Sequence, residues 1–321
     1  MSDDNINWGK PPLEKISLDE CEWYHAMEIP GIEGLTGSQP NTRDASFDCR
    51  EDIGNILGNL DYKGKKVINL GSITGYISFE AERRGGDVTS IDLSVDQSQM
   101  AKQQATERDW VPRANEDWKK DLRAFMDREV LRRNAFWFAH KALKSKSRLL
   151  ISHANNLPKE LELHDIGIIF SVLLHIRDPF LALQRMCSHI NEKIVITELG
   201  NYPTYLFKFI PSSMYIKYMD FIAHLKEEKK NLIDKLPNFI GKRFKNHPTM
   251  TFIPEYGRSA SKWWSFKPET IIAMLKILGF GKARVNYHYY LHTKGKKIWN
   301  FTVVAERTVP IEKCDYDYDA N

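Results

Sequence analysis

The residues best suited to bind a ligand lie in a glycine-containing stretch that reads Val67-Ile-Asn-Leu-Gly71-Ser-Ile-Thr-Gly75-Tyr-Ile-Ser-Phe79. In this stretch a predicted buried strand runs into a turn and then a helix. Gly71 lets the chain turn with little side-chain obstruction, and Gly75 lets a ligand approach the start of the helix. The unpaired N–H groups at a helix N-terminus favour an anionic or carbonyl-rich ligand. A tight turn with no ligand would explain the same spacing.

A carboxylate follows the glycine turn at the distance along the chain that is typical of nucleotide-binding sites. Asp92 ends the next predicted strand. In nucleotide-binding βαβ units, a carboxylate about 20 residues after the glycine turn accepts hydrogen bonds from ribose hydroxyls. The spacing therefore favours a nucleotide-like ligand but does not identify it. The alternative is that Asp92 only caps the following helix.

The rest of the chain must supply the strands and helices that position these residues. In the sequence, short apolar segments alternate with longer segments of helical pattern. Strands that are apolar throughout and alternate with helices predict a parallel sheet covered on both faces. Two late strands that meet through a short segment at 292–297 predict an antiparallel hairpin at one sheet edge. We therefore expect an α/β, Rossmann-like fold with seven strands, this edge hairpin and an inserted helical cap. The expected strands are 66–70, 88–92, 149–152, 166–171, 193–198, 283–289 and 299–305, and the expected helices are 76–84, 95–108, 128–144, 180–189, 214–236 and 268–278.

Composition excludes several classes of protein. The chain has 321 residues, a net charge of +4, 42% hydrophobic and 27% charged residues, which excludes a disordered chain. The weak positive charge neither requires nor forbids a nucleic-acid partner. The cysteines lie far apart, so we expect no metal site and no disulfide framework. No apolar run approaches the ~20 residues of a membrane span, and a soluble, cytoplasmic protein is expected. Its oligomeric state does not follow from the sequence.

Several motifs occur in one order along the chain and together carry a resemblance. They resemble those of class I S-adenosylmethionine-dependent methyltransferases, within them most the group that includes the wobble-uridine tRNA (5-oxyacetic acid) methyltransferases and relatives of unknown substrate. The resemblance spans roughly residues 20–200 and, more loosely, 262–306. The motifs are Glu22-Trp-Tyr-His25, Gly64-Lys-Lys-Val-Ile-Asn-Leu-Gly71, Phe79-Glu-Ala-Glu-Arg-Arg-Gly85, Ile91-Asp92, Ala135-Phe-Trp-Phe-Ala-His140, Asn155-Asn-Leu-Pro158, and Val172-Leu-Leu-His175 followed by Asp178-Pro179.

The resemblance implies S-adenosyl-L-methionine as the cofactor and a division of the chain around it. The segment 1–62, predicted to be helical and looped, would close over the cofactor, although the polar residues 1–18 are expected to fray. The core that binds the cofactor would be 63–198. An aromatic and basic cap on the substrate side, completion of the sheet and a disordered tail would follow at 199–262, 263–309 and 310–321.

The resemblance also implies which residues bind the cofactor. Asp92 would accept hydrogen bonds from both ribose hydroxyls. Asn69 stands where many members carry an acidic residue, so it accepts a hydrogen bond but brings no charge to the cofactor's ammonium group. The basic pocket with which some relatives hold a carboxylated cofactor has no match here, which favours the ordinary cofactor. The other implied contacts are Gly71 and Gly75 on the methionine part, Leu93 beside the adenine, Ala154 and Asn155 at the adenine edge, and Phe170 and Ser171 on the methionine side.

Other residues are candidates for the chemistry and for the acceptor. His175 is the best candidate for a catalytic base, because an unperturbed imidazole titrates near ~6.5. A histidine that is hydrogen-bonded near a loop and has no role in the reaction is the alternative. His25 is expected to close over the pocket or else to pack, and Glu198 to face the substrate. Trp263 and Trp264 resemble a pair at the mouth of the acceptor site in relatives.

The expected function is methyl transfer by an enzyme of the EC 2.1.1 class. A small-molecule acceptor, such as a sugar or a lipid-linked metabolite, ranks first because the cap could enclose it and the net charge is small. A tRNA acceptor ranks second, since the group resembled includes tRNA-modifying enzymes. A non-catalytic, methyltransferase-like subunit that stabilises a partner is the third possibility, and Asn69 keeps it open.

Overall fold

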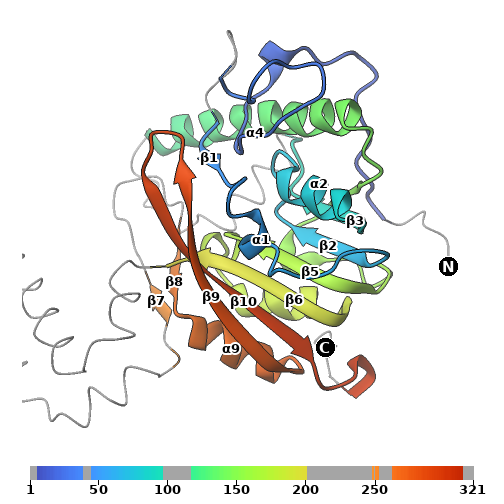
Figure 1. Ribbon diagram of the computed structural model, residues 1–321, viewed down its shortest axis with the longest axis vertical. Coiled ribbons are helices and arrows are strands. Elements are labelled where there is room, and N and C mark those ends of the chain that lie inside the picture. Colours follow the sequence, from blue (N-terminus) through green and yellow to red (C-terminus); the bar gives the residue numbers. More distant parts are fainter. Residues whose placement is uncertain are drawn as a thin grey trace, which may run out of the picture.

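A computed structural model of the protein describes residues 6–38, 45–96, 117–200, 248, 250–252 and 262–313. In these ranges an eight-stranded sheet has the order β1-β9-β10-β6-β5-β2-β3-β4, and β7 and β8 form a separate two-stranded sheet (Figure 1). The strands are β1 Phe47–Asp48, β2 Lys66–Leu70, β3 Asp87–Asp92, β4 Arg148–Ile151, β5 His164–Phe170, β6 Ile190–Leu199, β7 Met250–Phe252, β8 Trp264–Phe266, β9 Phe280–His292 and β10 Lys297–Arg307.

The helices in the described ranges are mostly short, with one long exception. The α-helices are α1 Ile53–Ile56, α2 Tyr76–Arg83, α4 Asp117–Ala142, α5 Pro179–Cys187 and α9 Pro268–Ile277, and the 3-10 turns are η2 Leu18–Glu20, η3 Ala154–Asn156, η4 Leu173–His175 and η5 Ile311–Lys313. Within the same ranges, no helix is both long enough and apolar enough to cross a membrane.

The order of the parallel strands creates one point where a ligand site is expected. From β2 the chain continues outward through β3 and β4, and then returns to pair β5 with the other side of β2. In such doubly wound sheets, ligands bind outside the carboxyl ends of the strands at this topological switch point. The predicted α/β, Rossmann-like fold is confirmed, and its switch point lies between β2 and β5.

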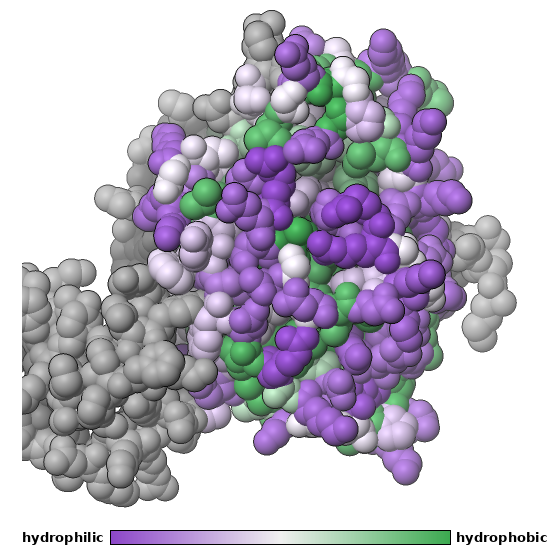
Figure 2. Space-filling model, viewed as in Figure 1, coloured by the Kyte–Doolittle hydropathy of each residue, from purple (hydrophilic) through white to green (hydrophobic). Residues whose placement is uncertain are grey.

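Helices cover both faces of the sheet, as the apolar strands predict. Side chains along β2 alternate between the faces, so Val67 packs with α2 and α4 in one buried cluster while Ile68 packs with α5 and α9 in another. Figure 1 shows α2 and α4 on one side of the sheet and α9 on the other. The face of the molecule in Figure 2 is largely hydrophilic, with small scattered hydrophobic areas.

The hairpin and the strand count differ from the prediction. The hairpin strands β9 and β10 are longer than predicted, and β10 lies inside the sheet, antiparallel to both β6 and β9. The short strand β1 pairs with β9 and makes an eighth strand. Two residues, Phe47 and Asp48, are too few to show an apolar alternation, so no pattern of residues predicts β1.

Several helix boundaries also differ. Helix α4 begins at Asp117, well before the predicted start at Arg128, because its polar first turns carry little apolar periodicity. Residues 95 and 96, the predicted start of a helix, are not helical, and the rest of that helix, 97–108, lies outside the described residues.

The N-terminal segment is more ordered than its polar composition predicted. Gly9 N–H donates to Leu149 O at 2.7 Å, and Ile151 N–H donates to Asn7 O at 2.9 Å. The guanidinium of Arg148 lies 4.8 Å from the centre of the Trp8 ring. Residues 7–9 therefore cover the outer edge of β4, whose backbone groups would otherwise be unpaired, and the expectation that they fray is wrong.

Most of the predicted cap lies outside the described residues. This holds for 201–247, which include the predicted helix 214–236, and for 249 and 253–261. The parts of 199–262 that are described include β7, which pairs with β8. At the C-terminus, the turn η5 lies within the predicted disordered tail 310–321, and residues 314–321 lie outside the described chain.

The burial of His164 leads to a prediction about how the free energy of unfolding depends on pH. It is 1% exposed, and its ring nitrogens have no hydrogen-bond partner among the described residues. Burial lowers the pKa of His164 to about 4. Because an unfolded histidine titrates near ~6.5, the unfolded chain binds more protons between these values, and the free energy of unfolding falls as pH drops through this window.

We predict that His164→Leu flattens this dependence, measured as urea midpoints between about pH 6.5 and 4.5. Equal slopes for the wild type and His164→Leu would contradict the prediction.

Candidate functional site

The glycine turn at 71–75 is held in a conformation that needs glycine at both ends. Gly71 has φ 80° and Gly75 has φ 86°, in the left-handed region that side chains disfavour. A Cβ on Gly71 would lie 2.4 Å from Val172 Cγ2, and one on Gly75 would lie 2.3 Å from Phe79 Cε2. The turn therefore packs closely against the chain after β5 and against α2, which by itself explains both glycines.

Asp92 is bound directly to this turn. Its Oδ2 accepts from Ile73 N–H at 2.6 Å and from Ser72 Oγ at 3.2 Å, and its Oδ1 accepts from Leu93 N–H at 2.8 Å. A carboxylate offers about four lone-pair sites, so Oδ1 keeps capacity for a ligand hydroxyl. The predicted pairing of the turn with Asp92 is therefore present in the structure.

The middle residue of the turn is strained. Ile73 has φ 50°, and a β-branched residue in this region costs about 1–2 kcal/mol. The hydrogen bond from Ile73 N–H to the Asp92 carboxylate is of the charge-assisted kind that contributes about 1.5–3 kcal/mol. Asp92 thus stabilises a turn that the residue at position 73 alone would not favour.

Arg133 is a site residue that sequence reasoning missed. Its Nη2 donates to Leu93 O at 3.0 Å and lies 3.6 Å from Asp92 Oδ2. Arg133 comes from α4, and its side chain is 8% exposed. The contact depends on how α4 crosses the end of β3, and no spacing in the sequence signals it. Arg133 therefore helps to fix the end of β3 in place.

Asn69 takes part in a buried polar chain beneath the turn. Asn69 Nδ2 donates to Ser78 Oγ at 2.9 Å, Ser90 Oγ donates to Ser78 Oγ at 2.7 Å, and Ser90 Oγ lies 3.0 Å from Ser147 Oγ. The side-chain amide of Asn69 donates the first of these bonds, whereas a carboxylate at this position could only accept one. Asn69 Oδ1 is buried and has no partner in the described chain.

The carboxyl end of β5 places two predicted residues beside β2. Ser171 has φ 52°, and its N–H donates to Thr197 O at 2.8 Å. The predicted adenine-edge residues Ala154 and Asn155 lie on η3, just after β4, where Asn155 N–H donates to His153 Nδ1 at 3.2 Å. Four non-glycine residues of the described chain have a positive φ, and two of them, Ile73 and Ser171, follow the strands on either side of the switch point. Strain of this kind is concentrated at functional sites.

His25 lies against the end of β5 inside a group of aromatic rings. Its ring centre is 5.8 Å from Phe170, 5.8 Å from Tyr76 and 4.8 Å from Tyr24. Burial, and to a lesser extent the charge of Arg132, lowers the pKa of His25 to about 3. The low pKa makes His25 a poor proton acceptor near neutral pH, and its ring packs among these aromatic side chains.

The remaining predicted residues gather around η4. His175 is exposed at the end of η4. Trp263 N–H donates to Leu174 O at 2.7 Å, and Trp264 Nε1 donates to Arg177 O at 3.2 Å. From β6, Glu198 Oε1 accepts from a backbone amide of η4. The structure thus brings His175, Glu198 and the tryptophan pair to one loop.

Buried polar atoms without a partner accumulate at these strand ends. An unpaired buried donor or acceptor costs roughly 1–3 kcal/mol, and each one in a native structure calls for an explanation. A polar ligand at the switch point would provide partners that the chain lacks. In the described residues these atoms include Asn69 Oδ1, Thr74 Oγ1, Asn155 Oδ1, Ser171 Oγ and the two ring nitrogens of His25.

A cleft is formed by residues of α2, of the N-terminal segment and of the loop after α4. Its volume is about 670 Å³, and Phe79 and Leu143 are among the residues that line it. Charged groups there pair with each other, as Arg83 does with Glu80 at 2.7 Å. None of the predicted site residues, all of which are described, lines this cleft.

Comparisons with known proteins find methyltransferases. No family model matches the chain. The chain is 54% identical over 37 residues to EEF1A lysine methyltransferase 3 of Mus musculus, and this match spans 12% of the chain and 16% of that protein.

Solved structures match a larger share of the chain, at lower sequence identity. Magnesium protoporphyrin IX methyltransferase from Synechocystis PCC 6803, with bound SAH, is 12% identical over 80% of each chain, with a TM-score of 0.39. The N-terminal domain of EvdMO1 with SAH bound is 12% identical over 89% of this chain and 91% of that one, with a TM-score of 0.43. The narrower resemblance to wobble-uridine tRNA methyltransferases stays a prediction.

The packing of Gly71 against Val172 gives a prediction. Gly71→Ala should lower the free energy of unfolding by more than the ~1 kcal/mol expected for the left-handed conformation alone, because the new methyl group meets Val172. Gly64→Ala is a matched control, since Gly64 has φ 70° and nothing within 4 Å of its Cβ position.

Urea unfolding of both variants, and of Gly71→Ala combined with Val172→Ala, separates the two contributions. The double variant should recover the part due to contact and keep the part due to conformation. Equal losses for Gly71→Ala and Gly64→Ala would contradict the close approach.

Proposed function

We propose that the protein is an S-adenosylmethionine-dependent methyltransferase that acts on a small-molecule acceptor in the cytoplasm. The observation that carries this proposal is the Asp92 carboxylate bound to the glycine turn at 2.6 Å, at the switch point of the sheet. A carboxylate in this place suits ribose hydroxyls. The likenesses to methyltransferases agree with this reading.

The residues present fit this cofactor along its length. Asp92 Oδ1 would accept hydrogen bonds from the ribose, and the unpaired Asn155 Oδ1 would take the amino group of the adenine. Asn69 Oδ1 and Ser171 Oγ, both without partners in the described chain, would meet the ammonium and carboxylate groups of the methionine part. The contacts at Asn155, Asn69 and Ser171 would each supply a partner for an atom that has none in the described chain.

The turn suits a nucleoside without phosphates better than a dinucleotide. In dinucleotide-binding turns, a middle glycine lets the backbone approach the pyrophosphate. Here the middle residue is Ile73, and its N–H is already bound to the Asp92 carboxylate. A phosphate at this amide would have to displace a carboxylate of the same charge. S-adenosylmethionine carries no phosphate and avoids this conflict.

Chemistry at this site requires mainly positioning. The bound cofactor supplies an electrophilic methyl carbon, so the chain must hold the acceptor atom in line with the carbon–sulfur bond. Such positioning contributes up to about 7–11 kcal/mol. If the acceptor is a hydroxyl, His175 would take its proton, and a general base adds roughly 10²–10⁴-fold to the rate.

A small acceptor is favoured by the surroundings of η4. Next to it lie Trp263, Trp264 and Phe252, with the ring centre of Phe252 6.0 Å from Trp263 and 5.3 Å from Trp264. Phe252 is 48% exposed. Aromatic rings of this kind suit the apolar face of a small molecule.

Calorimetry with S-adenosylmethionine tests the proposal. The wild type should bind, and Asp92→Ala should weaken binding at least about tenfold, because hydrogen bonds to a charged group contribute about 1.5–3 kcal/mol. Asp92→Asn keeps an acceptor and the size of the side chain, and it should bind with intermediate affinity. No binding by the wild type would contradict the proposal.

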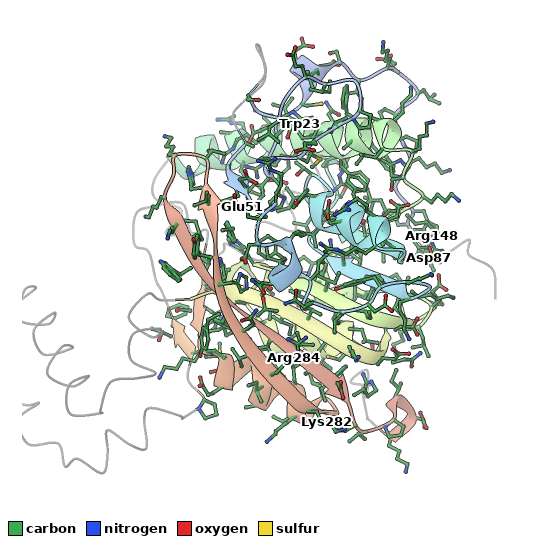
Figure 3. All side chains as sticks on the ribbon, in the orientation of Figure 1. Trp23, Glu51, Asp87, Arg148, Lys282 and Arg284 are labelled. Carbon is green, nitrogen blue, oxygen red and sulfur yellow. The ribbon has the colours of Figure 1, made fainter. Side chains whose placement is uncertain are left out.

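Asp87 is a matched control on the same strand. It lies at the opposite end of β3, exposed and beside Arg148 in Figure 3. Asp87→Ala should leave the affinity unchanged. Thermal unfolding of each variant shows whether a loss of binding comes from a loss of structure, since Asp92 also holds the turn.

The acceptor class is tested with a labelled methyl group. Incubated with the labelled cofactor and a cell extract, the enzyme should transfer label to the small-molecule filtrate and leave the RNA fraction unlabelled. Label in the RNA fraction, with a steep loss at higher salt as phosphate contacts require, would favour a tRNA acceptor instead.

A further inference from the structure

Glu198 is buried at the end of β6 with only part of its hydrogen-bonding capacity used. The residue is 1% exposed. Its Oε1 accepts from Leu173 N–H at 2.9 Å. Its Oε2 is buried and has no hydrogen-bond partner in the described part of the chain. The side chain therefore points at the backbone of the neighbouring loop.

The loop that receives this side chain has no local cap. The first N–H groups of any helical turn lack partners within the turn. The N-cap residue of η4 is Val172, whose side chain offers no oxygen and makes no capping bond in the described structure. Glu198 supplies the missing acceptor from the adjacent strand, at the position where Ser, Asp or Asn would normally provide it.

Other backbone contacts fix the same loop from two further sides. Ser171 N–H donates to Thr197 O at 2.8 Å, on the β6 side. Trp263 N–H donates to Leu174 O at 2.7 Å, from the segment before β8. Between these two contacts, the Glu198 carboxyl group holds the first amide of η4, and η4 ends at His175.

We propose that Glu198 is a positioning residue that caps η4 from the neighbouring strand and so fixes the backbone that carries His175. This role differs from the expectation that Glu198 faces the substrate, because its bound oxygen is used by the protein. The inference rests on the proposed function only where it concerns the rate of methyl transfer. The capping itself can be measured without any substrate.

The ionisation of Glu198 should make its contribution to the free energy of unfolding depend on pH. Burial raises the pKa of Glu198 to about 8, while the amides of Leu173, Leu174 and Val172 and the charge of Lys262 act in the opposite direction. Tyr290, from β9, also interacts electrostatically with Glu198, and burial holds the pKa of Tyr290 well above its usual value. At neutral pH the Glu198 carboxyl is therefore largely protonated.

The sign of the effect on stability follows from this raised pKa. An unfolded glutamate titrates near ~4.3, so between that value and about pH 8 the folded chain holds a proton that the unfolded chain has lost. The free energy of unfolding contributed by Glu198 thus falls as pH rises through this window. Glu198→Gln, which resembles the protonated acid and cannot ionise, should remove this part of the pH dependence.

The test combines Glu198→Gln with Glu198→Ala, studied in the full chain. In Glu198→Ala the amide hydrogen exchange at Leu173 should become about fivefold to tenfold faster, and kcat should fall by a similar factor with KM for S-adenosylmethionine unchanged, as loss of a cap predicts. Glu198→Gln should keep wild-type exchange and kcat. Glu192→Ala, at the other end of β6, is the matched control and should change neither.

The outcomes separate this inference from the proposed function. Unchanged hydrogen exchange at Leu173 in Glu198→Ala would overturn the inference. A higher KM for the acceptor, with kcat and exchange unchanged, would also overturn the inference, because that result marks a residue that contacts substrate. If no acceptor is ever methylated, the proposed function fails. Faster exchange in Glu198→Ala together with the missing pH dependence in Glu198→Gln would still support the cap.

Discussion

The site depends on one hydrogen bond, from the Ile73 amide to the Asp92 carboxylate. It joins the turn after β2 to the end of β3 and holds a β-branched residue at φ 50°. Without it, the strain at Ile73 would favour another backbone conformation, and the carboxylate would lose its shortest contact with the turn. With it, one oxygen of Asp92 is committed to the turn and the other keeps capacity for a ligand hydroxyl. The conformation of the turn and the proposed cofactor binding therefore depend on the same side chain.

Around this bond, elements that are distant in the sequence contact one another. Helix α4 contacts the end of β3 through Arg133 and the N-terminal segment through Arg132, whose Nη2 lies 3.1 Å from Glu22 Oε1. That segment continues to His25, which stacks on Phe170 at the end of β5. A polar ligand at the switch point would therefore meet groups that are held by the helix, by the N-terminal segment and by the strands together.

Patterns in the sequence predicted the features that depend on residues close together in the chain. The apolar strands, the glycine turn with its helix, and the place of Asp92 all follow from periodicity and spacing. The patterns did not predict β1, the start of α4 or the pairing of residues 7–9 with β4, since these depend on tertiary contacts and not on periodicity. Arg133 and the capping role of Glu198 were missed for the same reason: each acts on backbone far away in the chain.

A crystal structure of the protein with S-adenosylhomocysteine tests the central claim most directly. The account predicts the two ribose hydroxyls within hydrogen-bonding distance of the Asp92 carboxylate, with the Ile73 amide still bound to the same group. A nucleoside bound elsewhere, for example in the cleft lined by Phe79 and Leu143, or an Asp92 side chain turned away from the ribose, would contradict it.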